Sequence, residues 1–276
     1  NLINEPVIGV SYDGTGYGDD GAIWGGEIFI ADYAAYQRKY HLSYMPLPGG
    51  DSSVVHPIRI AYAYLTSSNL ETDFLHGISS LEKRVIDSQL QNKFNLFQTS
   101  SMGRLFDCVS AMMGLFSTIT FEAQSAMALE QLCAGSTLPV TTCYPFRFHD
   151  NEIDIIPLLR SVTDDIFNGE SLDLIARKFH NTIIELTISA VTTIKLETEI
   201  NIVVLSGGVM QNMVLLEGLV NGLRGLGISV FYASRLPAND GAIAMGQVLI
   251  ANHAIKGIDS IAPHKGSHYR LNHSQE

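Results

Sequence analysis

Residues 13–27 read Asp-Gly-Thr-Gly-Tyr-Gly-Asp-Asp-Gly-Ala-Ile-Trp-Gly-Gly-Glu, and they carry six glycines and four acidic side chains. Apolar runs at residues 7–10 and 28–30 flank this stretch and have the composition of buried strands. Glycine lets the backbone approach a ligand closely, and successive backbone N–H groups in such a turn bind phosphate. Acidic side chains beside them can hold a metal ion on that phosphate. A glycine-rich hairpin is most often only a tight turn, but the single tryptophan and the clustered acids favour a ligand site.

The composition is that of a packed globular protein. The chain has 276 residues, enough for one large domain or two smaller ones, with 46% apolar and 16% charged residues. Its net charge of -11 argues against a nucleic-acid surface, which requires clustered lysine and arginine. A small anionic ligand is compatible with this charge, because a local site can differ in sign from the whole protein.

Cysteine usage and the absence of targeting signals point to the cytoplasm. Cys108, Cys133 and Cys143 form no Cys-x-x-Cys pair, and we expect reduced thiols in the core. No signal peptide and no apolar run long enough to span a membrane is apparent. The chain begins at Asn1 without a methionine, and we expect it to be a piece of a longer protein or a processed chain.

The pattern of apolar residues predicts strands first, then helices, then an alternation of the two. We predict strands within residues 6–47, a break over residues 46–51 that caps a helix, and helices over 54–67 and 81–94. Two helices are predicted within 102–132, broken near residues 117–118, then short strands or loops over 136–157 and a helix over 171–196. The end of the chain reads as strand 202–205, helix 209–223, strand 230–232 and helix 241–251, which indicates an α/β sheet.

A second glycine turn follows the predicted strand 202–205. Gly207 and Gly208 end that strand and open a helix, and helix N-termini attract anions. Asn212 is predicted one turn into the helix, with an amide free to contact a base or ribose. An ordinary strand-to-helix turn explains the same residues equally well.

Three further acids are candidates for the site. Asp240 precedes the last predicted helix and is either its N-cap or, because open α/β sheets bind ligands at strand ends, a metal ligand. Asp107 stands on an otherwise apolar helix, so we expect it to face solvent, a partner or a ligand such as two ribose hydroxyls. Glu122, expected on the next helix, would share that work, although a surface acid is the simpler explanation.

No arrangement for covalent catalysis is visible in the sequence. His180 reads as a packed core histidine, and His41, His56 and His149 lack the spacing of metal ligands. Neither a Ser-His-Asp nor a Cys-His pattern can be recognised.

Taken together and in order, these motifs resemble the C-terminal part of the HypF carbamoyltransferase family over nearly the whole chain. The matching segments are Asp13–Gly18, Trp24–Glu27, Pro46–Asp51, Ser100–Asp107, Leu205–Asn212 and Asn239–Gly241. The resemblance implies an actin/hexokinase/Hsp70-like (ASKHA) α/β fold, built on an RNase H-like lobe with a large helical insertion. It assigns residues 1–262 to the TsaD-like carbamoyltransferase domain, mostly its second lobe, and residues 263–276 to a loose polar tail.

The resemblance also implies an activity. Family members use carbamoyl phosphate and ATP to make a carbamoyl-adenylate, and this domain passes the carbamoyl group to the C-terminal cysteine of the partner HypE. That group becomes the cyanide ligand of [NiFe]-hydrogenase iron. Neither nucleic acid nor membrane is an expected partner.

By position in the motifs, Asp13 and Asp240 match catalytic aspartates that bind a divalent metal (Mg, Zn or Fe), and Gly14, Gly207 and Gly208 match turns on the phosphate side. Asp107 and Glu122 match the ribose region, and Asn212 matches the nucleoside side.

The chain departs from the family in two ways. Glu122-Ala123-Gln124 replaces the usual Glu-Gly-Gln, which tightens the nucleotide pocket. A histidine-rich motif that supplies two metal ligands would precede residue 1, so the metal site is expected to be incomplete here. Two alternatives remain open: a relative of tRNA threonylcarbamoyl transferases, which the net charge and residues 24–27 disfavour, and an inert nucleotide-binding or partner-docking fragment.

Overall fold

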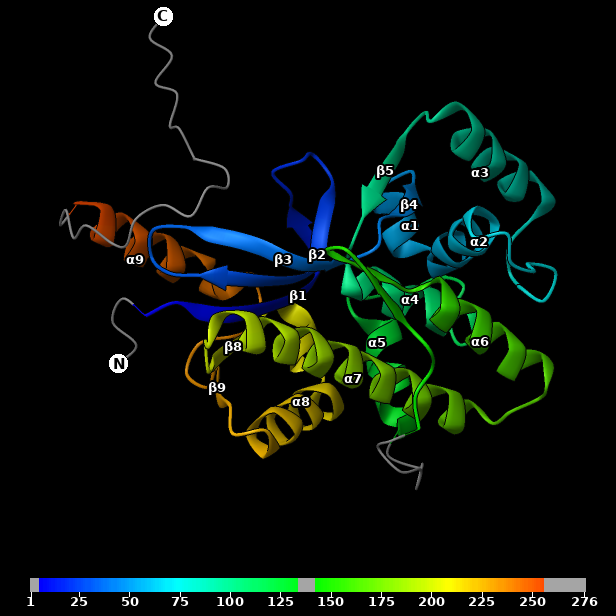
Figure 1. Cartoon of the computed structure of the whole chain (residues 1–276). Helices are drawn as coiled ribbons and strands as arrows, with labels where there is room; N and C mark the ends of the chain where they lie inside the picture. Colours follow the sequence, from blue (N-terminus) through cyan, green and yellow to red (C-terminus); the bar gives the residue numbers. More distant parts are fainter. Residues whose placement is uncertain (1–4, 134–141, 256–276) are drawn as a thin grey trace, which may run out of the picture.

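The computed structural model describes residues 5–133 and 142–255. Its strands join into one mixed sheet, whose main path runs β6-β7-β3-β2-β1-β8-β9 (Figure 1). The first three strands, β1 (Val7–Tyr17), β2 (Ile23–Ala31) and β3 (Tyr36–Leu42), form an antiparallel meander. The strands β8 (Ile202–Ser206) and β9 (Ser229–Tyr232) then extend the sheet parallel to β1.

The alternation of side chains along β1 fixes which face of the sheet is the core. Ile8, Val10 and Tyr12 are fully buried, so the residues between them, including Ser11, point to the other face. The Tyr12 hydroxyl lies 2.7 Å from Thr187 Oγ1 on the long helix beneath β1.

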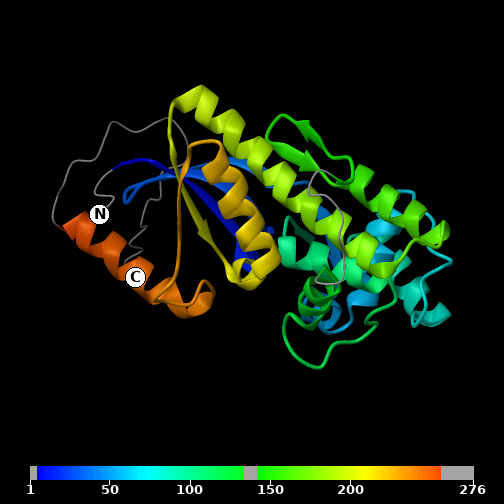
Figure 2. The ribbon, with the colours of Figure 1, turned by 90° about the horizontal axis from the view of Figure 1, so that it is seen from below.

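Helices lie on both sides of this sheet, but only those on the core face are packed against it, because α9 (Ile243–Ile255) has no buried residue. On the core face, α7 (Leu172–Thr198) packs against α8 (Met213–Gly225), while α9 lies on the other side of the strands (Figure 2).

A mostly helical insertion separates β3 from α7, as Figure 1 shows. Its elements are β4 (Met45–Pro48), α1 (Asp51–Val55), α2 (Pro57–Ser67), α3 (Ser80–Asn92), β5 (Leu96–Thr99), α4 (Met102–Met112), α5 (Gln124–Cys133), β6 (Arg147–His149), β7 (Glu152–Asp154) and α6 (Ile156–Phe167). Helix α4 is its link to the sheet, because it contacts α2 and α5 as well as β1 and β2.

The predicted α/β class, the opening strands, the helix at 171–196 and the alternating end of the chain are confirmed. The helix predicted over 54–67 is confirmed for residues 57–67, but residues 54 and 55 belong to a separate short helix, because Pro57 starts a new helix after His56. Residues 46–48 belong to β4 rather than to a break, since β4 pairs only with the short strand β5 and tolerates proline. Helix α6 was not predicted. The proposed tail, residues 263–276, lies outside the described residues.

Two expectations from composition can be compared with the structure. Cys108 and Cys133 are buried thiols as expected, but Cys143 is exposed, so the prediction that all three lie in the core is wrong. None of the helices within the described residues combines the length and the apolar character needed to cross a bilayer.

Candidate active site

A bulge in β1 creates the centre of the site. Tyr12 pairs with Gly26 and Gly16 pairs with Trp24, so three residues of β1, beginning at Asp13, face the single residue Gly25. A Cβ on Gly25 would lie 2.4 Å from the carbonyl oxygen of Asp13, so only glycine allows this close approach. Bulges of this kind re-aim side chains and are common beside active sites.

The Asp13 carboxylate is half-buried in the bulge. Its Oδ1 accepts a hydrogen bond of 2.8 Å from the backbone N–H of Gly14. Burial raises the pKa of this carboxyl above its usual value, the N–H groups of Gly14 and Gly208 oppose the rise, and the charges of Asp240 and Glu122 add to it. The carboxylates of Asp240 and Glu122, from two other segments, are thus near enough for their charges to act on Asp13, and both are exposed.

The second glycine turn lies directly beside Asp13, because β1 and β8 are parallel neighbours. Gly207 has φ +96°, and a Cβ there would come within 2.1 Å of the Tyr12 carbonyl oxygen, so the position demands glycine. The next residue begins a short 3-10 helix (Gly208–Gln211), and a Cβ on Gly208 would lie 3.1 Å from Asp13 Oδ1. The two predicted glycine turns thus form one site.

Asp240 begins a 3-10 helix (Asp240–Ala242) at the same edge of the sheet. The alternative of Asp240 as an N-cap is wrong, because Asn239 is the cap and its Oδ1 accepts from Gly241 N–H at 3.2 Å. The Gly207 N–H donates to the carbonyl of Ala238 at 3.0 Å, which joins this segment to the glycine turn.

The carboxylates of Asp13 and Asp240 suit a divalent cation as two of its ligands. The negative charge of Asp240 raises the pKa of Asp13, and a cation bound between the two carboxylates would offset this repulsion. Within residues 5–133 and 142–255, however, no three His, Cys, Asp or Glu side chains lie close enough to hold a metal ion by themselves. A metal site formed by Asp13 and Asp240 stays a prediction.

Of the three surroundings expected for Asp107, the structure excludes solvent, and its contact with the ribose of a nucleotide stays a prediction. Only 3% of the residue is exposed, and its Oδ2 lies 3.1 Å from Nη1 of Arg104, one turn earlier on α4. Burial raises the pKa of the Asp107 carboxyl, and the nearby guanidinium opposes the rise. Arg104 was missed in the sequence, although an arginine on an apolar helix was a signal available there.

Glu122 lies in the turn before α5 rather than on the helix, so that expectation is also wrong. Its neighbour Ala123 has φ +61°, a left-handed conformation that strains any residue with a Cβ. The left-handed backbone is the physical reason that glycine suits this position.

Replacing Ala123 with glycine is expected to stabilise the protein by about 0.5–1 kcal/mol, because relief of the left-handed strain exceeds the entropy gained by the unfolded chain. Urea denaturation followed by circular dichroism measures the change. Ala128→Gly, inside α5, is the matched control and should destabilise by about 1 kcal/mol. Equal losses in both variants would contradict the expectation.

Asn212 is not free to contact a ligand, contrary to prediction. It caps α8, with Oδ1 accepting from the Leu215 N–H at 3.0 Å, and its Nδ2 lies 2.9 Å from Nε2 of His180. The residue is buried, and both ends of the amide are engaged within the protein.

His180, the partner of Asn212, also contacts Cys133, a Cys-His contact that the sequence did not reveal. His180 is fully buried, with Nδ1 2.9 Å from the Ala176 carbonyl oxygen and 3.1 Å from Cys133 Sγ. Burial raises the pKa of the Cys133 thiol to about 12 and lowers that of His180 to about 4. A neutral, inaccessible thiol is no nucleophile, so the cluster is structural.

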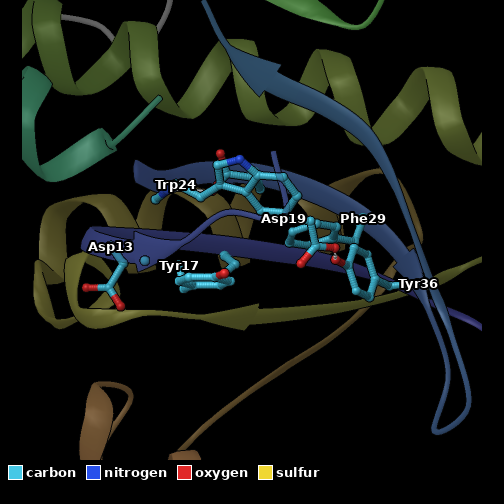
Figure 3. Close-up of a pocket in the computed structure, with 10 residues that line it drawn as sticks. Asp13, Tyr17, Asp19, Trp24, Phe29 and Tyr36 are labelled. Carbon is cyan, nitrogen blue, oxygen red and sulfur yellow. Dashed lines mark hydrogen bonds between the residues drawn. The ribbon is translucent and has the colours of Figure 1, made fainter. Parts of the chain in front are cut away.

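A pocket of about 290 Å³ continues from Asp13 along β1 and β2. Figure 3 shows Asp13 at one end and Asp19, Phe29 and Tyr36 gathered toward the other. The lining residues are Ser11, Asp13, Gly16, Tyr17, Asp19, Trp24, Gly25, Glu27, Phe29 and Tyr36. Seven of these ten residues belong to the stretch 13–27, which the sequence had singled out as a ligand site.

A buried ion pair that the sequence did not reveal supports the pocket wall. Glu27 is 2% exposed, and its Oε1 accepts from Arg38 Nη2 at 2.9 Å and from the Ser100 hydroxyl. The Arg38 guanidinium lies 3.9 Å from the centre of the Trp24 ring. Because these groups come from β2, β3 and the start of α4, only the folded chain brings them together.

Comparison with known proteins identifies the family. Residues 9–247 match the family model described as carbamoyltransferase, Kae1-like domain, second subdomain. The chain is 36% identical to the carbamoyltransferase HypF of Synechocystis and 31% identical to HypF2 of Cupriavidus necator, in each case over 90% of this chain and 34% of the relative. It thus spans about a third of the length of the curated relatives it matches.

A solved structure gives the same result. A crystal structure of full-length HypF in the phosphate- and nucleotide-bound form superposes with a TM-score of 0.87 at 38% identity, over 93% of this chain and 41% of that one. The chain belongs to the HypF carbamoyltransferase family, of which it carries the second Kae1-like subdomain.

Proposed function

We propose that this subdomain transfers a carbamoyl group from a carbamoyl-adenylate, made from carbamoyl phosphate and ATP, to the C-terminal cysteine of HypE. The product is the precursor of the cyanide ligand of [NiFe]-hydrogenase. The observation that carries the proposal is the proximity of Asp13 in the β1 bulge, the Gly207–Gly208 turn and Asp240, just beyond the point where the parallel pairing of β1 with β8 ends at Ser11 and Ser206. Open α/β sheets bind ligands at such strand ends.

The residues have separate roles in this proposal. The glycines of the two segments, Gly14 and Gly208, would leave room for a phosphate to approach the backbone beside Asp13, with which both backbone N–H groups interact. Asp13 and Asp240 would hold a divalent cation, which when bound would polarise the acyl-phosphate and stabilise the leaving phosphate. The incoming nucleophile belongs to the partner, so this chain needs no reactive thiol, in agreement with the buried, neutral state of Cys133.

Mass spectrometry tests the proposal. These residues, in their natural chain, are incubated with ATP, carbamoyl phosphate, Mg²⁺ and a peptide that ends in cysteine. We expect the peptide to gain one carbamoyl group on sulfur, and a peptide that ends in serine to remain unchanged.

The site assignment is tested with Asp240→Asn, which should reduce carbamoylation about 100-fold if the carboxylate holds the cation. Unchanged transfer by this variant would remove Asp240 from the site. Modification of tRNA in place of the cysteine peptide would favour the threonylcarbamoyl-transferase alternative instead.

A further inference from the structure

Arg104 is a buried cation with unused hydrogen-bonding capacity. It is 7% exposed and stands on α4 among fully buried apolar residues. A guanidinium carries five N–H donors, yet Nε and Nη1 of Arg104 are enclosed without a hydrogen-bond partner. The carboxylate of Asp107 lies 3.1 Å away, but its Oδ2 is likewise without a directed hydrogen bond. This ion pair therefore compensates the charge of Arg104 without satisfying its donors.

The remaining guanidinium nitrogen of Arg104 points at the glycine turn of β1. A Cβ on Gly14 would lie 2.9 Å from Nη2, so this nitrogen fills the space that a side chain would need. Gly14 does not have positive φ, so space and not backbone conformation explains the glycine. None of the described residues forms a hydrogen bond with Nη2: the ion pair with Asp107 is made by Nη1, and the hydrogen bond to Ser101 by the backbone N–H.

The position of the guanidinium is fixed by the start of α4. The Ser101 hydroxyl lies 2.7 Å from the Asp13 carbonyl oxygen and 2.8 Å from that of Gly14, and it also accepts the Arg104 N–H at 3.1 Å. A Cβ on Gly103 would come within 2.8 Å of the Gly14 Cα, so helix and bulge are in direct contact. The N-terminus of α4, with its partial positive charge, therefore abuts the bulge together with Arg104.

We propose that Arg104 is a ligand-binding residue of this site, and that its Nη2 donates to a phosphate oxygen of the bound nucleotide beside Gly14. The inference rests on the proposed function only for the nature of that ligand. A buried guanidinium is suited to this role because hydrogen bonds from a charged donor to phosphate are strong and directional.

A purely structural role of Arg104, as counter-ion to Asp107, makes a different prediction. In that case Arg104→Met would weaken phosphate binding only by leaving the Asp107 charge unpaired, and neutralising Asp107 as well should restore the binding. If Arg104 contacts the ligand, the double variant Arg104→Met/Asp107→Asn remains as defective in phosphate binding as Arg104→Met alone.

Titration of the 276-residue chain with inorganic triphosphate, and separately with adenosine, tests the inference. Amide chemical shifts of Gly14 and Gly208 report binding at this site. We expect Arg104→Met to weaken triphosphate binding about 10- to 100-fold. Adenosine, which has no phosphate, should bind as it does to the wild type. Arg160→Met, at an exposed arginine, is the charge-matched control and should leave both affinities unchanged.

A second variant keeps the test valid if Arg104→Met does not fold. Gly14→Ala displaces the end of the guanidinium and should weaken triphosphate binding in the same direction, whereas Gly9→Ala meets only the Phe29 Cβ at 3.9 Å and should have no effect. Three results would each overturn the inference. They are an unchanged triphosphate affinity in Gly14→Ala and Arg104→Met, wild-type triphosphate affinity in the double variant, and no triphosphate binding by the wild type. Triphosphate binding that depends on Arg104, without carbamoylation of a thiol, would uphold it while contradicting the proposed function.

Discussion

Replacing Asp13 with asparagine is expected to lower carbamoyl transfer by about 100- to 1,000-fold while the fold is retained. Asparagine keeps the side-chain oxygen that accepts the Gly14 N–H at 2.8 Å, so the bulge should survive. It removes the negative charge that would hold a cation beside Asp240. It also removes repulsion from the carboxylates of Asp240 and Glu122, which should raise the Tm of the variant at neutral pH.

The pH dependence follows from the direction of the Asp13 pKa shift. Burial raises this pKa above its ordinary value of 3.8, so the folded protein binds the proton more tightly than the unfolded chain. The stabilisation of Asp13→Asn over the wild type should therefore be present above the folded pKa and disappear as the pH falls to 3.8. Transfer by the wild type should decline with falling pH through this raised pKa, and added Mg²⁺ should shift the decline to lower pH.

Thiol carbamoylation and thermal unfolding measure the two effects on the same samples. Asp73→Asn, at an exposed aspartate of the insertion, is the matched control and should change neither quantity. Wild-type activity in Asp13→Asn would show that this carboxylate takes no part in transfer. Loss of activity together with a collapsed fold would show that its role is structural.

The proximity of Asp13 to the Gly207–Gly208 turn was predictable in part, because each follows an apolar run with the composition of a buried strand, and parallel neighbours bring such segments to the same edge. The bulge was not predictable: the sequence indicated a turn after residue 13, but β1 continues through it to Tyr17, paired with β2. Asp240 follows in the same way from the next strand and turn.

The errors have two different causes. Arg104 and Asp107 are three residues apart on α4, so helical spacing alone could have paired them; the burial of the pair could not be predicted, because the depth of α4 depends on its packing with α2 and α5. The free amide of Asn212 was wrong because its partner, His180, is 32 residues earlier on α7. A contact over that distance in sequence forms only through tertiary structure, so it could not be derived from periodicity.

His180→Phe is expected to destabilise the protein by about 2–4 kcal/mol at pH 7. Phenylalanine fills the same buried space but leaves the Asn212 amide N–H without the partner that now lies at 2.9 Å, and the Ala176 carbonyl oxygen, which also accepts within helix α7, loses its contact with the imidazole. Each unsatisfied buried group costs about 1–3 kcal/mol. Because Asn212 caps α8 directly after the Gly207–Gly208 turn, the loss should also loosen the phosphate side of the site.

Coupling between the two side chains distinguishes this network from simple core packing. Asn212→Ala alone should cost about 0.5–2 kcal/mol as a lost helix cap. If His180 acts through Asn212, the double variant should be more stable than the sum of the single changes predicts, with a coupling of about 1–2 kcal/mol. Urea denaturation of the wild type, the two single variants and the double variant gives the free energies of unfolding for this cycle. His149→Gln, at an exposed histidine, is the control and should change stability by less than about 0.5 kcal/mol.

The pH dependence of stability provides an independent measurement of the same network. Burial lowers the pKa of His180 to about 4, below the 6.5 of an exposed histidine, so the unfolded chain binds the proton first. The wild type should therefore lose about 3 kcal/mol from this group as the pH falls from 6.5 to 4. His180→Phe lacks the titrating group, so the stability difference between the two proteins should narrow over that range. A constant difference, or strictly additive effects in the cycle, would show that the imidazole does not hold Asn212 and that the start of α8 is fixed by packing alone.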